Sequence, residues 1–201
     1  MADIRVCFTK TGKLKYISHL DLQRAIHRLL VRSGLPISFS EGFNPHPRLN
    51  IALPLSIFQE GERELFDFRL TKDVPIEEIK EKLQSAVFPE MEIVEVSLAV
   101  GKLHTKRAVW RLELETKMEL NDFVSAFDRE MTVVKQTKNG DKLVDISPMV
   151  KFISAQPVEN GIIARVELPA EGGNYLNPSY VTSFFGDKLK VLRVVRENIL
   201  F

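Results

Sequence analysis

The feature that most restricts the fold is an amphipathic helical pattern over residues 18–34 that carries its own start and stop signals. Apolar residues recur along one helix face, at Leu22, Ile26, Leu29 and Leu30. Ser18 and Asp21 have the spacing of a capping box, and Gly34 followed by Pro36 marks the end of the helix. The chain must therefore supply a core that covers this apolar face.

A second face of the same helix is positively charged, with one arginine per turn at Arg24, Arg28 and Arg32. No acidic residue lies between Gln23 and Leu35 to neutralise them. Guanidinium groups at this spacing suit the recognition of phosphate or carboxylate groups. The alternative is a solvated helix face that only improves solubility.

The segment Ser40–Arg48, which reads Ser-Glu-Gly-Phe-Asn-Pro-His-Pro-Arg, has a composition that argues against a simple spacer. Its two prolines fix the backbone on both sides of His46, so the imidazole stands on a stiff support. Phe43 and Arg48 supply a stacking surface and a phosphate contact, the combination found at single-stranded nucleic acid sites. Alternatively, Phe43 packs into the core and the prolines only shape a tight connection.

Charge is distributed unevenly along the chain. Residues 1–56 contain eight Lys or Arg against three Asp or Glu, a net charge of +5, and three of the four histidines. The remaining residues carry 20 basic and 24 acidic side chains, a net charge of −4, which gives +1 for the whole chain. This asymmetry is typical of a polyanion-binding face on an otherwise ordinary protein.

Three motifs in the first half of the chain point to a known family. They are Tyr-Ile-Ser-His-Leu-Asp-Leu-x-Arg (16–24), Gly-Leu-Pro-Ile-x-Phe-Ser-x-Gly-Phe-Asn-Pro-His-Pro-Arg (34–48) and Ala-Leu-Pro-Leu (52–55). With these motifs the chain resembles DUF2344, a bacterial radical-SAM-linked domain of unknown function, and the resemblance runs from Ile4 to near the C-terminus. Nine residues match the family pattern: Tyr16, Ser18, His19, Asp21, Arg24, Phe43, Asn44, His46 and Pro47.

The resemblance implies RNA-related work without naming a reaction. Domains of this family are fused behind a B12-type radical SAM enzyme or encoded beside one, near genes for a ribonuclease and for large-subunit ribosomal proteins. The family offers no established catalytic residues. We therefore expect an RNA-binding or substrate-presenting partner of a radical SAM enzyme, with ribosomal or transfer RNA as its target and no cofactor. The expected contact residues are Lys13, Lys15, Tyr16, Arg24, Arg28, Arg32, Phe43, Asn44, His46 and Arg48.

Two alternatives stay open, although we lean towards a protein that is not an enzyme. The first is an RNA nuclease or a metal-assisted hydrolase, because metal-free RNA cleavage needs a base and an acid, and His19, His46 and Tyr16 are suitable types. Asp21 would join the two histidines as a metal ligand, with Cys7 as a further candidate, but the spacing is unlike that of close-set ligand pairs. The second alternative is a protein adaptor that contacts the radical SAM partner without RNA.

The composition sets further limits on these readings. The 201 residues are 44% hydrophobic, enough for one sizeable core or two small ones. No hydrophobic run has spanning length and no signal-peptide pattern is present, so we expect a cytoplasmic protein. The lone Cys7 excludes an internal disulfide, and it also excludes the three-cysteine iron-sulfur site of a radical SAM enzyme within this chain.

We predict an α+β fold of two ferredoxin-like (split βαβ) units in tandem, with mainly antiparallel sheets, over residues 1–100 and 107–201. The predicted elements of the first unit are strands at 4–9, 37–40, 49–54, 65–70 and 92–98, and helices at 18–33 and from Pro75. In the second unit we predict a strand at 109–115, a helix over 120–127, hairpin turns at Asn139-Gly140 and Asn160-Gly161, a helix from Asn177-Pro178 to Gly186, and a last strand at 189–195.

Overall fold

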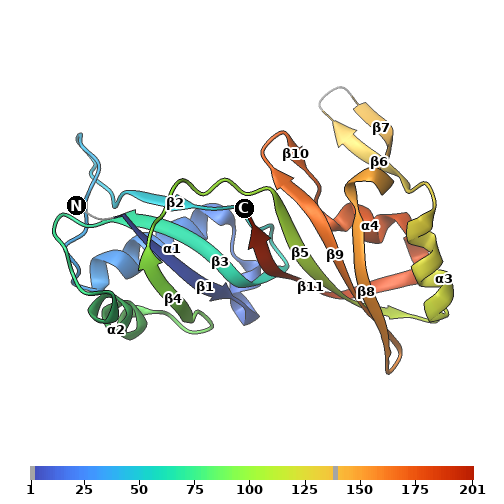
Figure 1. Ribbon diagram of the computed structural model, residues 1–201, viewed down its shortest axis with the longest axis horizontal. Helices are drawn as coiled ribbons and strands as arrows, with labels where there is room; N and C mark the ends of the chain where they lie inside the picture. The colour runs from blue at the N-terminus through green and yellow to red at the C-terminus, as the bar shows by residue number, and fades with distance from the viewer. Residues whose placement is uncertain (1–2, 138–139) are drawn as a thin grey trace. The chain divides into compact units, whose positions relative to one another are not determined.

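The computed structural model describes residues 3–137 and 140–201 and has a mixed α+β fold with mostly antiparallel sheet (Figure 1). The chain divides into two compact units, unit 1 over Met1–His104 and unit 2 over Thr105–Phe201. Within the described ranges, none of the helices combines the length and the apolar content that crossing a bilayer requires.

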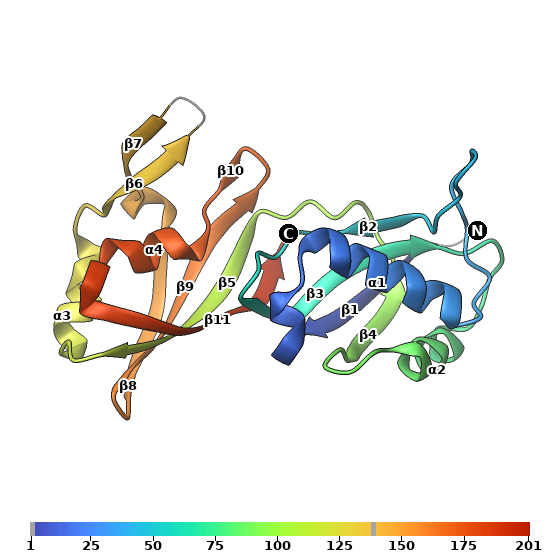
Figure 2. The ribbon, with the colours of Figure 1, turned by 180° about the vertical axis from the view of Figure 1, so that it is seen from behind.

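Unit 1 has four strands, two α-helices and one 3₁₀ turn. In chain order these are β1 (Asp3–Lys10), η1 (Gly12–Tyr16), α1 (His19–Arg32), β2 (Leu49–Ile51), β3 (Gln59–Arg69), α2 (Ile76–Ala86) and β4 (Ile93–Leu98). The strands lie in the order β2-β3-β1-β4, and β1 pairs antiparallel with both β3 and β4. Both helices lie on the same side of these strands (Figure 2).

The core of unit 1 forms between the helices and one face of the sheet. Side chains alternate along β1, so that Ile4, Val6 and Phe8 face the helices and are buried. The apolar face of α1 packs against them, and Ile26 and the three leucines of the predicted stripe are buried. Residues Asp3, Arg5 and Cys7 alternate onto the opposite side of the strand, which we call the open sheet face.

The start and end of α1 follow the sequence signals. The Ser18 hydroxyl accepts a hydrogen bond from the Asp21 amide at 3.1 Å, which satisfies one of the free donors at the helix start. After the last turn, Gly34 has φ +66°, a left-handed conformation that glycine adopts without strain. Helix α2 begins directly after Pro75, as predicted.

Three strand predictions in unit 1 need correction. Residues 37–40 do not form a continuous strand and contribute only two isolated bridges, Ile37 with Leu70 and Phe39 with Pro47. Strand β2 ends at Ile51 rather than at residue 54, where a proline lacks the amide that a ladder needs. Strand β3 begins at Gln59, six residues before the predicted start. The described residues of unit 1 therefore form four strands, one fewer than the five predicted.

Unit 2 has a longer series of strands. Its elements are β5 (Arg107–Thr116), α3 (Leu120–Ser125), η2 (Ala126–Asp128), β6 (Thr132–Thr137), β7 (Gly140–Asp145), η3 (Ser147–Met149), β8 (Lys151–Val158), β9 (Gly161–Glu171), β10 (Asn174–Tyr175), α4 (Pro178–Phe184), η4 (Gly186–Lys188) and β11 (Leu189–Leu200). Strand β9 pairs with β8, β10 and β5, and β5 pairs with β11, whereas β6 and β7 form a separate two-stranded sheet.

Local signals in unit 2 are mostly confirmed. Asn160, with φ +62°, turns the chain between β8 and β9, and the Asn177 side chain accepts a hydrogen bond from the Ser179 amide at 3.0 Å to cap α4. The predicted helix over 120–127 forms as α3 followed by η2. The last strand, β11, extends to Leu200. The predicted turn at Asn139-Gly140 lies outside the described residues.

Candidate functional site

The predicted arginine stripe on α1 is only partly free to meet a ligand. Arg24 donates to the exposed Asp21 carboxylate at 3.0 Å, so an acidic residue one turn earlier shares its charge. Arg32 donates to the carbonyl of Ala86 at the end of α2. This bond joins the two helices and engages part of the Arg32 guanidinium, although the residue is exposed. The contact of Arg32 with a ligand stays a prediction. Arg28 is exposed, and among the described residues it has no ion pair or side-chain hydrogen bond.

The Ser40–Arg48 loop holds His46 firmly on the molecular surface. The His46 amide donates to the Ser40 hydroxyl at 3.1 Å, and the His46 Nδ1 atom lies 3.0 Å from the same oxygen. The Asn44 carbonyl lies 3.3 Å from Nδ1, and the Arg48 guanidinium donates to the Phe39 carbonyl at 3.2 Å. These four contacts restrain the imidazole and its neighbours.

Phe43 lies at the outer part of this loop and is fully exposed. The alternative in which Phe43 packs into the core is therefore wrong. Asn44, His46 and Arg48 are also exposed, so an aromatic ring and a cation share one restrained surface segment. Gly42 has φ +117°, which lets the chain reverse next to the ring.

The sequence did not single out His27, which the structure places next to the loop. Its ring centre lies 5.7 Å from that of His46, and its Nε2 atom is buried without a hydrogen-bond partner in the part of the chain that the structure describes. Burial, and then the charge of His46, lower the pKa of His27. The only sequence signal for this contact is the presence of both histidines in the basic segment.

The groups proposed for catalysis or metal binding are not brought together. His19 lies at the start of α1, where burial, and then the nearby Lys10 charge, lower its pKa. The Asp21 carboxylate accepts hydrogen bonds from Ser18 and Arg24, and these bonds lower its pKa. His46 is bonded to Ser40 instead. Within the described ranges no group of three or more potential ligands could hold a metal ion.

Cys7, the further metal candidate, is buried on the open sheet face. Burial raises the pKa of its thiol. No contact joins it to His19 or His46 among the described residues. A buried thiol of this kind acts as a small apolar side chain.

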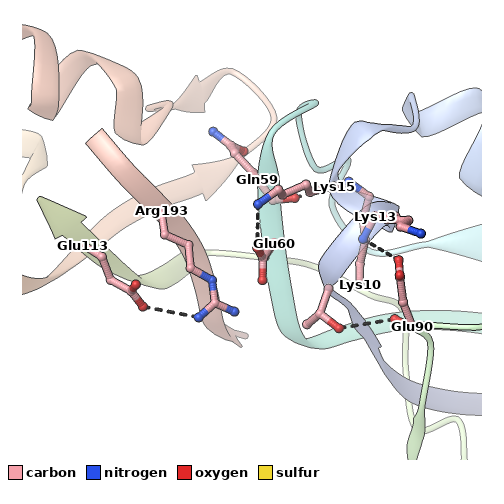
Figure 3. Close-up of polar contacts among 9 residues, drawn as sticks. Lys10, Lys13, Lys15, Gln59, Glu60, Glu90, Glu113 and Arg193 are labelled. Carbon is pink, nitrogen blue, oxygen red and sulfur yellow. Dashed lines mark hydrogen bonds and ion pairs between the residues drawn. The ribbon is translucent and has the colours of Figure 1, made fainter. Parts of the chain in front are cut away.

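The η1 turn presents the remaining predicted contact residues just before α1. Lys15 donates to the Glu60 carboxylate at 3.3 Å (Figure 3). Its Nζ atom lies 5.4 Å from the centre of the Tyr16 ring. The Tyr16 ring meets the edge of Phe58, with ring centres 5.8 Å apart. The Lys13 side chain is exposed, while its backbone amide donates to the Glu90 carboxylate (Figure 3).

The open sheet face of unit 1 carries arginines that are all paired with acids across the strands. Arg5 contacts Asp67 at 2.9 Å, Arg69 contacts Asp3 at 2.6 Å, and Arg63 contacts Glu95 at 3.2 Å. Strands of unit 2 repeat the arrangement: Arg165 with Glu197, Lys190 with Glu115, and Arg193 with Glu113, the last drawn in Figure 3. These faces neutralise their own charge and offer little to a polyanion.

These observations define an α+β protein whose unit 1 presents basic and aromatic side chains from a turn, a helix and a loop. The chain belongs to the family described as "Uncharacterized protein conserved in bacteria (DUF2344)", whose model matches residues 3–178. The resemblance noted in the sequence motifs is thereby confirmed for the family.

Comparison with solved structures gives a distant likeness. A chain in the crystal structure titled "Crystal Structure of a Cbf5-Nop10-Gar1 Complex" has a TM-score of 0.50 and 8% sequence identity, over 98% of this chain and 48% of that one. The present chain thus spans about half the length of its structural neighbour, and the likeness concerns the fold alone. No curated protein matches the chain.

Proposed function

We propose that this protein binds RNA through unit 1 and acts as an RNA-binding or substrate-presenting accessory of a radical SAM enzyme. The proposed binding surface, which we call the helix-and-loop side, consists of the η1 turn, the exposed side of α1 and the Ser40–Arg48 loop. Ribosomal or transfer RNA is the expected target, and the bacterial cytoplasm is the expected location. The radical SAM partner follows from the family resemblance of the sequence motifs.

The single observation that carries this proposal is the fully exposed Phe43 on a restrained loop. Burial of a phenylalanine side chain stabilises a fold by about 1.5–3 kcal/mol, and the exposed Phe43 does not contribute this energy. The loop does not collapse onto the core because Ser40 and His46 hold it through two hydrogen-bond contacts. An exposed ring on a restrained loop that also carries Arg48 suits a stacked nucleobase and its phosphate.

The distribution of unpaired charge supports the same surface. Arg28 and the Lys13 side chain are exposed and have no acidic partner in the described parts of the chain. The arginines of the open sheet face are paired across the strands. An RNA backbone therefore gains more from the helix-and-loop side.

The strand orders also support the finer fold prediction of two ferredoxin-like units. In unit 1 the chain order strand-helix-strand-strand-helix-strand gives the spatial order β2-β3-β1-β4. In unit 2, β8-β9-β5-β11 repeats that order, with the β6–β7 hairpin between α3 and β8 and with β10 beside β9. Folds of this class serve many functions, so this inference adds nothing to the RNA proposal by itself.

The direct test is RNA binding across a salt series, with two variants of equal charge change. The first variant is Arg24→Glu with Arg28→Glu on α1, and it leaves out Arg32 because that residue joins the helices. The second is Arg63→Glu with Arg69→Glu on the open sheet face. We expect the α1 variant to lose more than about tenfold in affinity and to lower the log-log salt slope by about 1.4, the effect of two lost single-strand phosphate contacts. The sheet variant should keep the wild-type slope.

Equal losses in both variants would show only a response to net charge and would overturn the assigned surface. Absence of RNA binding by the unaltered protein would overturn the RNA proposal and favour the adaptor alternative, which pull-down of the radical SAM partner would then test. Cleavage of the added RNA, abolished by His46→Ala, would favour the nuclease alternative.

A further inference from the structure

Phe58 has an unusual backbone conformation for an exposed aromatic residue. Its φ is +69°, a region that costs a bulky side chain about 1–2 kcal/mol and that glycine or asparagine normally occupies. Its side chain is 69% exposed, so core packing does not repay the strain. Strain of this kind persists when surrounding contacts impose it, and it gathers at functional sites.

A second strained residue holds the same part of the chain. Across residues 3–137 and 140–201, three residues other than glycine have positive φ, and two of them, Phe58 and Glu90, flank the η1 turn. The Phe58 amide donates to the Lys15 carbonyl at 2.7 Å. From the other side, the Glu90 carboxylate accepts the Lys13 amide and the Glu90 carbonyl accepts the Thr11 hydroxyl (Figure 3).

Gly12 makes the close approach of Glu90 possible. A Cβ atom at this position would lie 3.0 Å from the Glu90 carboxyl carbon, and the glycine has φ +55°. The turn is therefore fixed between two strained residues and begins at a position whose backbone conformation favours glycine. Such a support restricts the directions in which Tyr16 and Lys13 project.

The fixed turn brings two exposed rings together. Tyr16 and Phe58 are 56% and 69% exposed, and their planes meet at 82°. This edge contact covers one edge of the pair and leaves ring surface open to solvent. Lys15 lies over the Tyr16 ring, and the exposed Lys13 side chain projects from the same turn. Ring surface beside cations matches a nucleobase with its phosphate.

We propose that Tyr16 and Phe58 form a stacking platform for one unpaired nucleobase, with Lys13 contacting the adjoining phosphate. This inference rests on the proposed RNA-binding function and narrows its substrate class to single-stranded RNA. Bases within a duplex are stacked on one another and cannot offer their faces to a protein ring. The platform lies at the start of α1 and is a separate contact from the Phe43 loop that follows the helix.

The sharpest variant is Phe58→Gly, because glycine adopts the observed φ without strain while the ring is lost. Binding is measured with a single-stranded RNA of about ten nucleotides that carries a fluorescent base analogue, and with a duplex of the same sequence. The unaltered protein should bind the single strand more tightly and quench the analogue by stacking. Phe58→Gly should lose at least about fivefold in single-strand affinity and most of the quenching, with an equal or higher melting temperature.

Tyr16→Leu tests the platform without changing the backbone at position 58, and Leu98→Ala on β4 is a matched control for loss of an exposed apolar side chain. Tyr16→Leu should also reduce quenching, and the control should not. RNA binding with unchanged single-strand affinity and quenching in both platform variants would overturn the platform and leave the RNA function standing. Failure of the unaltered protein to bind either RNA would overturn both.

Discussion

The two sides of unit 1 both carry arginines, but the surroundings of these arginines differ. On the open sheet face, Arg5, Arg63 and Arg69 each contact a carboxylate on another strand. On the helix-and-loop side, Arg28 has no acidic partner among the described residues, and Arg24 shares an exposed aspartate. Paired charges stabilise the fold or do little, whereas exposed unpaired charges are available to a ligand. The comparison therefore separates a face whose charges are paired internally from the face that we propose for binding.

The largest expected effect is the loss of RNA affinity in Phe43→Ala. Removal of a stacked ring costs about 1–3 kcal/mol, equivalent to about 5-fold to 150-fold in affinity. The melting temperature should not change, because the ring contacts no core residue and is fully exposed. Fluorescence anisotropy with labelled RNA measures the affinity. If Phe43→Ala binds as tightly as the unaltered protein, the loop is not part of the binding face.

The reverse pattern is expected for Arg5→Ala on the open sheet face. Arg5 donates two hydrogen bonds to Asp67, both at 2.9 Å, and both side chains are mostly buried. Removing Arg5 leaves the Asp67 carboxylate mostly buried without its ion-pair partner. The free energy of unfolding should therefore fall by about 1–2 kcal/mol. RNA affinity should stay within about twofold, the scatter expected of a site outside the interface. Urea denaturation measures the stability, and a loss of RNA affinity as large as that of Phe43→Ala would contradict the separation of the two faces.

Much of the helix-and-loop side could be predicted from the sequence, because its elements depend on local signals. The cap at Ser18, the glycine after α1 and the proline-bounded loop each involve residues a few positions apart. Contacts between distant residues could not be predicted in this way. The bond from Arg32 to Ala86 and the approach of His27 to His46 depend on how α1 packs against α2 and the loop.

Phe58 shows a different limit of sequence reasoning. Left-handed backbone is normally signalled by glycine or asparagine, and neither is present at this position. Residues 37–40 show a third limit, because their alternating pattern favours a strand but the neighbouring chain supplies only isolated bridges. Both features are set by tertiary contacts rather than by local preference.

A smaller effect is expected when Arg24 is released from its acidic partner. Asp21→Asn removes the carboxylate that accepts the Arg24 guanidinium at 3.0 Å, while an amide oxygen remains to accept a hydrogen bond. Exposed ion pairs are weak because water screens them, so RNA affinity should rise by no more than about fivefold at low salt. This affinity is measured in the same salt series as that of the arginine variants. Asp73→Asn, elsewhere in unit 1, is the matched control for the change in net charge, and an equal rise in both would assign the gain to net charge alone.

The smallest expected effect concerns pH, and it tests the contact that joins α1 to the loop. Burial, and then His46, lower the pKa of His27 below its ordinary value of 6.5 in the folded protein. The unfolded chain therefore binds this proton more readily, and stability rises with pH through this range. The contribution of His27 is complete above pH 6.5 and is lost as the pH falls through the lowered value. Carboxylates with lowered pKa, such as Asp3 on the open sheet face, lose their contributions only below 3.8.

We would measure melting temperatures of the unaltered protein and of His27→Gln between about pH 5 and pH 8. This range includes the titration of His27 and lies above that of the carboxylates. The neutral amide cannot take up the proton, so the variant should show a shallower fall in melting temperature on acidification to pH 5. Part of the fall in melting temperature should remain in the variant, because burial and Lys10 also lower the pKa of His19. Parallel curves for the two proteins would contradict the lowered pKa of His27 in the folded protein. A shallower curve would mean that protonation of His27 destabilises the folded protein at a pH where the ion pairs of the open sheet face stay intact.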